Sequence, residues 1–167
     1  MKGFIAIGAV LFASGCAFSP VNAPAPEKYT PLESKVEIKN LDKAQTLEVV
    51  KSALTSFGYE VVSVIPELGE VKTKNLQVQI PERCDCGTWN GNVVSGSAQS
   101  RMEVIVSNTQ PTGTKAVIKH YCATEFYGRN LYGMITTQQP IVCASRGTIE
   151  KDVLDKIDRI AGARAQK

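Results

Sequence analysis

The chain has 167 residues, of which 43% are hydrophobic, and its 19 basic and 16 acidic residues give a net charge of +3. This length suits one domain of roughly 100–150 residues with short flanking segments. The near balance of charge argues against nucleic acid as a partner, because nucleic-acid-binding domains usually cluster many Lys and Arg residues on one face.

The N-terminal residues have the pattern of an export signal. Lys2 supplies a positive charge, and Phe4 to Phe12 form an apolar run of nine residues. A run of this length fits the apolar region of a signal peptide, which is roughly 7–15 residues long. It is too short to cross a bilayer, which takes about 20 apolar residues. We therefore expect residues 1–15 to be a signal peptide.

Small residues then lead to a cysteine, in the order Ala13-Ser14-Gly15-Cys16. This stretch resembles the lipobox of bacterial lipoproteins, although Ala13 stands where that family usually has leucine. The resemblance implies cleavage before Cys16 and lipid on that cysteine. Ala17, in place of an aspartate, favours the outer membrane, with the domain on the periplasmic side. The alternative is an ordinary secretory signal that happens to be followed by a cysteine.

Residues 16–34 are expected to form a tether between the lipid and a single domain at residues 35–167. The segment contains Pro20, Pro24, Pro26 and Pro31 and has little apolar periodicity. Proline removes hydrogen-bond donors and favours extended backbone, so this composition predicts a semi-rigid spacer. A simply disordered segment is the alternative.

The first regular element of the domain is predicted to be a helix over residues 42–57. Asp42 and Gln45 have the spacing of a capping box. Apolar residues then recur every three or four positions, which places them on one helical face; they are Leu47, Val50, Leu54 and Phe57. Gly58 follows, where a helix often ends in a residue with positive φ.

The middle of the chain reads as strands, and its end reads as a second helix. Alternating or β-rich runs occupy residues 59–65, 70–74, 76–80, 101–107 and 115–123, with shorter candidates at 132–137 and 141–143. The turn residues between 107 and 115 predict a hairpin. From Thr148 onward, a helical stripe appears that consists of Ile149, Val153, Ile157 and Ile160.

These elements predict an α+β fold. Each helix has one apolar stripe and most strands have one apolar side, so both kinds of element need a covering layer. We expect a two-layer sandwich in which two helices pack on one face of a mostly antiparallel sheet.

The segment from Leu47 to Lys74 resembles part of a known family. A helix ends in Phe57-Gly58-Tyr59, a strand and a tight turn follow, and Gly69 opens a second strand. This order is similar to the helix and first hairpin of BamC-like helix-grip domains of envelope lipoproteins. The resemblance implies the same fold and an envelope setting.

Four cysteines follow Cys16, and an even number in an exported domain predicts two disulfides. They are Cys84, Cys86, Cys122 and Cys143. A bond between Cys84 and Cys86 would close a tight, strained ring, so we expect each to bond Cys122 or Cys143, with the pairing left open. Such bonds would fasten the glycine-rich loop at residues 81–100 to the sheet.

We expect no metal, no cofactor and no catalytic centre. A zinc site made by all four cysteines is the alternative, but structural zinc sites usually space their pairs C-x(2–4)-C. No Cys-x-x-Cys redox motif is present. His120 is the only histidine, and strand alternation places it with Ile118 and Cys122. We therefore expect it to be buried or at an edge rather than catalytic.

Two irregular segments are candidates for binding a partner. Their side chains are of the types enriched at interface hot spots; they are Trp89, Phe126, Tyr127, Arg129 and Tyr132. Alternatively, the aromatic residues form a minor core that covers the sheet face opposite the helices.

The sequence favours a lipid-anchored, non-catalytic accessory or scaffold subunit of a bacterial envelope complex, serving outer-membrane assembly or secretion. Its expected partners are the membrane, through lipid on Cys16, and envelope proteins. A small-ligand or inhibitor-binding module facing the periplasm is the alternative. A lipid-anchored hydrolase fits less well because no acid–base constellation is visible in the sequence.

Overall fold

A computed structural model describes residues 34–89, 92–129 and 132–165 of the chain. The signal peptide, Cys16 and most of the tether that we predict lie outside these residues. The elements are β1 (Ser34–Lys39), α1 (Lys43–Ser56), β2 (Val61–Ile65), β3 (Glu70–Thr73), β4 (Leu76–Gln79), α2 (Ile80–Arg83), β5 (Cys84–Asp85), β6 (Thr88–Trp89), β7 (Asn92–Val93), β8 (Ser97–Asn108), β9 (Gly113–Arg129), β10 (Ile135–Ser145) and α3 (Thr148–Ala165). Among the described residues, no helix has both the length and the apolar character needed to cross a lipid bilayer.

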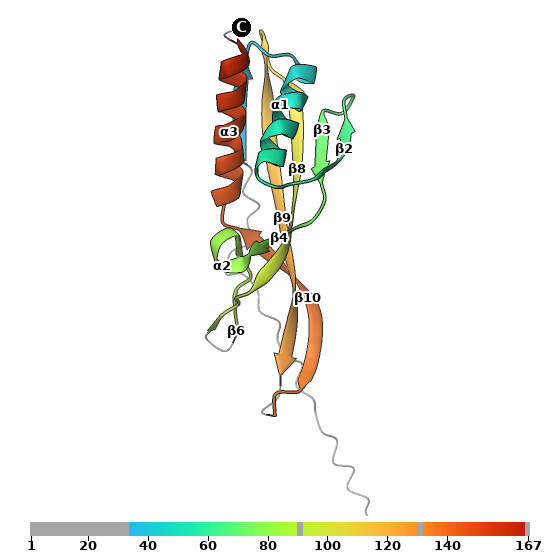
Figure 1. Ribbon diagram of the computed structural model, residues 1–167, viewed down its shortest axis with the longest axis vertical. Coiled ribbons are helices and arrows are strands. Elements are labelled where there is room, and N and C mark those ends of the chain that lie inside the picture. The colour runs from blue at the N-terminus through green and yellow to red at the C-terminus, as the bar shows by residue number, and fades with distance from the viewer. Residues whose placement is uncertain (1–33, 90–91, 130–131, 166–167) are drawn as a thin grey trace, which may run out of the picture.

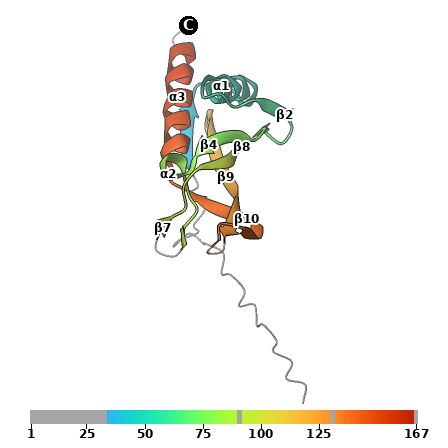
Figure 2. The same cartoon turned by 60° about the horizontal axis from the view of Figure 1, so that its bottom comes forward.

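The main sheet is antiparallel and is organised around β9. Its strands follow the order β2-β3-β8-β9-β10-β5, while β1 pairs with the first part of β9 and β4 with the first part of β8. The predicted hairpin is confirmed: β8 and β9 pair from Gln99↔Ala123 to Asn108↔Thr114. The sheet curls along its length, and α1 and α3 lie side by side at one end of it (Figures 1 and 2).

Helix α1 forms where its sequence predicts it. The carboxylate of Asp42 accepts a hydrogen bond from the Gln45 amide, and the Gln45 side chain accepts one from the Asp42 amide, so the capping box is confirmed. The helix is followed by Gly58 at φ +83°, a backbone conformation that glycine adopts without a steric penalty.

The main core lies between the two long helices and the inward face of β1, β3, β8 and β9. Alternate residues of the strands and the apolar stripes of the helices meet in it. It contains Ile38, Leu41, Leu47, Val49, Val50, Ala53, Leu54, Tyr59, Val71, Met102, Val104, Val106, Ala116, Ile118, Ile149, Val153, Ile157 and Ala161. The α+β class is therefore confirmed.

A second, smaller core lies further along β9. It contains Ile80, Cys84, Cys86, Ala98, Cys122, Phe126, Ile141 and Cys143. Residues 81–100, which we predicted as a loop, include the short elements α2 and β5 and a small β6–β7 hairpin. Two strand predictions merge into one element, because residues 135–137 of the first candidate and all of 141–143 belong to β10, whereas residues 132–134 precede it.

Beyond their contact with β8, β9 and β10 continue as a two-stranded ribbon. The last β9 residue that pairs with β8 is Ala123. From Thr124 to Arg129, the pairing found within the described chain is with β10, from Ile141 to Ile135. We call this ribbon the arm, and it projects away from the helices (Figure 1).

The aromatic segment does not cover the sheet face opposite the helices, because β9 carries it out into the arm instead. That face bears charged side chains, among them Glu70, Lys72 and Glu103, which form ion pairs of 2.9 and 3.7 Å through Lys72. Arg101 stacks over the ring of Tyr121 on the same face. One polar face on an antiparallel sheet is ordinary.

Candidate functional site

The four cysteines form two disulfides at the base of the arm. Cys84 bonds Cys122, and Cys86 bonds Cys143. Each of the four side chains is at most 3% exposed. The prediction that Cys84 and Cys86 each bond a distant partner is therefore confirmed, and the bonds join β5 and the residue after it to β9 and β10.

These bonds also bear on the alternative of a zinc site made by the four cysteines. The Sγ atoms of Cys84 and Cys122 and a ring nitrogen of His120 lie within 4.8 Å of one another. Zinc binds thiolates, and here both sulfur atoms are held in a disulfide. The four-cysteine zinc alternative therefore does not describe this arrangement.

A chain of buried polar side chains crosses the boundary between the two cores. The hydroxyls of Tyr59 and Ser100 share a hydrogen bond of 2.7 Å, and Ser100 Oγ lies 2.7 Å from Nε2 of His120. On the other side of the ring, Nδ1 lies 2.9 Å from the Ser145 hydroxyl. Burial raises the pKa of Tyr59, so its hydroxyl keeps its proton and remains a donor.

Glu150, in the first turn of α3, completes this cluster. Its Oε2 lies 3.3 Å from Nδ1 of His120, and both side chains have no exposed surface. Within the described chain, neither Glu150 oxygen makes a hydrogen bond of good geometry. Burial raises the pKa of Glu150, but His120 and Ser145 together outweigh it, so the pKa lies below the ordinary value. The carboxylate is therefore charged at neutral pH.

The series Ser100, His120, Glu150 has the residue types of the nucleophile, the general base and the orienting carboxylate of acyl-transfer enzymes. Ser100, however, lies in the middle of β8, where it pairs with Leu76 on one side and Cys122 on the other, and it has no exposed surface. A substrate carbonyl would have to enter between paired strands to reach it. The cluster is therefore suited to holding three elements together rather than to acylation.

Our sequence reasoning singled out only His120 of the five side chains in this cluster, although two of the others have a periodic signal. Glu150 lies on the buried stripe of α3, three residues before Val153 and seven before Ile157. Ser100 alternates with the inward-facing Ala98 and Met102 of β8. The burial predicted for His120 is confirmed.

The predicted partner-binding residues separate into core and surface. Phe126 belongs to the second core and is 8% exposed, whereas Tyr127 is 43% and Tyr132 is 86% exposed. Trp89 ends β6 and Arg129 ends β9. The side chains of these last two residues lie outside the described part of the structure.

A groove runs along the base of the arm beside Tyr127. Its volume is about 560 Å³, and it is lined by residues that include Gln99, Ala123, Glu125, Tyr127 and Pro140. The Tyr127 hydroxyl donates to Glu125, which also accepts a 3.0 Å hydrogen bond from Gln138. The bond to Glu125 raises the pKa of Tyr127. The groove therefore presents an aromatic ring fixed beside a carboxylate.

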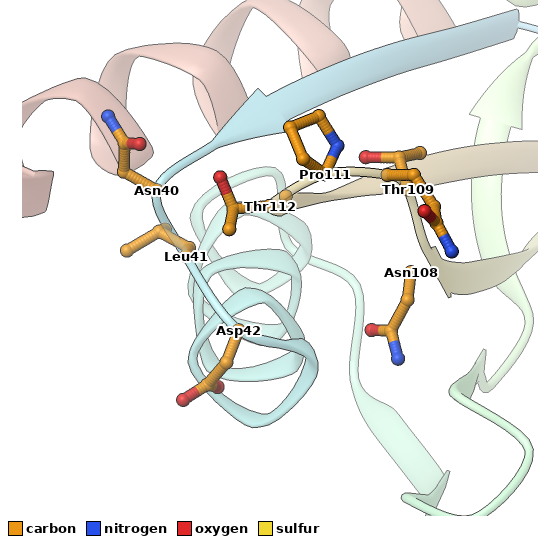
Figure 3. A pocket seen from close by; sticks show the side chains of 9 residues that line it. Asn40, Leu41, Asp42, Asn108, Thr109, Pro111 and Thr112 are labelled. Atoms are coloured by element: carbon orange, nitrogen blue, oxygen red, sulfur yellow. The ribbon is translucent and has the colours of Figure 1, made fainter.

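A second hollow lies at the opposite end of β9, where the β1–α1 and β8–β9 connections meet (Figure 3). Its volume is about 630 Å³, and its lining includes Asn40, Asp42, Asn108, Gln110 and Thr112. Asp42 contributes a carboxylate to this lining, and the other side chains contribute amide and hydroxyl groups, so the hollow suits a polar ligand. They are exposed side chains on two turns, however, and no predicted site residue is among them.

No family model matches the chain, and no curated protein matches it. The lipobox and BamC-like resemblances therefore stay predictions.

Proposed function

We propose that this chain is a lipid-anchored, non-catalytic accessory subunit of a bacterial envelope complex, on the periplasmic side of the outer membrane. We further propose that the groove at the base of the arm receives a protein partner. The observation that carries this proposal is Tyr127, a half-exposed aromatic residue on the groove rim. Its strand, β9, carries one disulfide and pairs with β10, which carries the other. Aromatic residues presented on rigid elements are common interface anchors.

The construction of the molecule supports a scaffold role. We infer that the end carrying α1 and α3 is a two-layer unit, because both helices bury their stripes in one core with Val104 and Ile118. A two-stranded ribbon is not stable by itself. The arm is held because Phe126 and Ile141 enter the second core and because the disulfides fasten its base.

The two alternatives have weaker support. A hydrolase would use Ser100, which is buried between paired strands. A small-ligand module would use the polar hollow of Figure 3, whose lining is mostly exposed turn residues. Neither site contains a residue that we predicted to bind.

Neighbouring residues on β9 provide a matched test. Full-length tagged protein, extracted from envelopes in mild detergent, is compared with Tyr127→Ala and Phe126→Ala. We expect Tyr127→Ala to keep its melting temperature and lose the co-purifying partner, since a hot-spot residue contributes at least about 2 kcal/mol. Phe126→Ala should instead cost roughly 3–5 kcal/mol of stability, as a buried aromatic residue does.

Two results would contradict the proposal. If Tyr127→Ala lowers the melting temperature as far as Phe126→Ala does, then Tyr127 is a core residue. If Tyr127→Ala folds normally and retains every partner of the parent protein, the groove is not the docking site.

A further inference from the structure

The end of the arm gathers large apolar side chains at the surface. Tyr132 is 86%, Met134 is 61% and Ile135 is 54% exposed. We call these three residues the arm tip. They lie beyond the groove, because Ile135 pairs with Arg129 at the far end of β9.

The charge pattern around the tip is one-sided. Glu125 is followed by 24 residues without a carboxylate, as far as Glu150. Arg129 is the basic residue of this stretch next to the tip, whereas Arg146 lies at the other end of β10, near α3. Aromatic rings, aliphatic side chains and arginine are the groups that settle at the boundary between lipid headgroups and acyl chains, whereas carboxylates are disfavoured there.

The tether would leave the domain toward the same end. β1 runs antiparallel to β9, with Ser34 opposite Ile118 and Lys39 opposite Gly113. The N-terminal end of β1 therefore points along β9 toward Arg129. Eleven residues of strand separate Ile118 from Arg129, which corresponds to about 36 Å at the usual rise of a strand.

The length of the tether matches this distance. Eighteen residues lead from Cys16 to Ser34, and a proline-rich chain of that length can span up to about 56 Å, at about 3.1 Å per residue. A lipid on Cys16 and the arm tip can therefore reach one membrane surface together.

We propose that the arm tip rests in the headgroup region of the membrane that holds the Cys16 lipid, as a second contact of this protein with the bilayer. This inference rests on the lipid anchor of the proposed function. It uses residues distinct from the groove, so that the bilayer holds the tip while the groove remains open to a protein.

Fluorescence quenching by brominated lipids tests the inference. The chain has a single tryptophan, so Trp89→Phe combined with Tyr132→Trp leaves one indole, at the tip. The lipidated full-length variant is reconstituted into phosphatidylethanolamine–phosphatidylglycerol vesicles with and without brominated acyl chains. The matched control combines Trp89→Phe with Leu68→Trp. Leu68 is 65% exposed, in a turn whose Gly69 accepts a hydrogen bond from Val106, near the other end of the sheet.

We expect several-fold stronger quenching at position 132 than at position 68, because only the tip would approach the acyl chains. Equal quenching in vesicle-bound protein would overturn the membrane contact and leave the anchor intact. Vesicle flotation separates the two proposals: if the parent protein, purified from envelopes, has no lipid on Cys16 and does not float with the vesicles, the anchor itself is contradicted. In cells, a photo-crosslinking residue at position 132 should capture phospholipid. Capture of a protein alone would show that the tip is a protein contact instead.

Discussion

Nδ1 of His120 lies 3.3 Å from Oε2 of Glu150, and neither side chain has exposed surface. A buried charge is stable only when a partner compensates it. This pair joins the middle of β9 to the first turn of α3, at the boundary of the two cores. Several consequences of this cluster and of the disulfides beside it can be measured.

Replacing Glu150 with glutamine should destabilise the protein by about 1–3 kcal/mol at neutral pH, because His120 and Ser145 lose the carboxylate that they face in a buried site. Because the folded-state pKa of Glu150 is lowered, its contribution is complete above the ordinary value of 4.5 and is lost as pH falls through the folded value. Urea unfolding at about pH 7 and about pH 3 should therefore show a smaller acid loss for Glu150→Gln than for the parent protein.

The control for this measurement is Asp155→Asn, which removes an exposed pair with Lys151 on the same helix. An exposed pair contributes about 0–1 kcal/mol. Equal stability of Glu150→Gln and Asp155→Asn at neutral pH would show that the buried pair does not hold α3 to the sheet.

Replacing Ser100 with alanine should cost about 1–3 kcal/mol, because Tyr59 and His120 each lose a hydrogen bond in a buried site. Ser107→Ala, at an exposed position of the same strand, should change stability little. A fluorophosphonate probe should label neither the parent protein nor these variants. Labelling that disappears in Ser100→Ala would instead support the hydrolase alternative.

Removing either disulfide, by replacing both of its cysteines with serine, should destabilise the domain by about 4 kcal/mol. Each bond closes a long loop and so lowers the conformational entropy of the unfolded chain. The cysteines of these bonds are 38 and 57 residues apart in the sequence. The loss of stability is measured by thermal melts, with and without reductant, of two variants: Cys84→Ser/Cys122→Ser and Cys86→Ser/Cys143→Ser. Mass spectrometry of the native protein should find these cysteines resistant to alkylation. Four reactive thiols with one bound zinc would refute the bonding pattern.

Replacing Cys16 with serine should abolish incorporation of labelled fatty acid and release the protein from membranes or leave it as uncleaved precursor. Ser14→Ala keeps a small residue before the cleavage site, so it should be processed and lipidated normally. Incorporation of radiolabelled palmitate measures lipidation, and membrane fractionation measures attachment to the membrane. Lipid label that persists on Cys16→Ser would exclude this cysteine as the anchor.

Local patterns predicted the elements whose determinants are close together in sequence. The Asp42–Gln45 box and the stripe through Leu54 specify α1 without reference to the rest of the chain. The turn before Gly113 does the same for the β8–β9 hairpin. Both are decided within a few residues, so sequence periodicity captures them.

Other features depend on contacts between distant residues. β1 was not predicted because six residues become a strand only when β9 pairs with them, although Val36 and Ile38 alternate inward. The predicted candidates at 132–137 and 141–143 left a gap that contains Pro140, yet Pro140 lies within β10, where an edge strand tolerates a missing donor. Burial of Glu150 depends on His120, which is thirty residues earlier in the chain.

The entry of the tether through β1 also has a mechanical consequence. β1 lies along the axis of β9, joined to it by a ladder of six residue pairs from Ser34 to Lys39. Tension arriving from the membrane at Ser34 is directed along the strand, so it loads this ladder in shear and all the pairs resist together. The same tension applied across the strand would open the pairs one at a time. The orientation of one short strand thus equips the domain to withstand pulling on its own anchor.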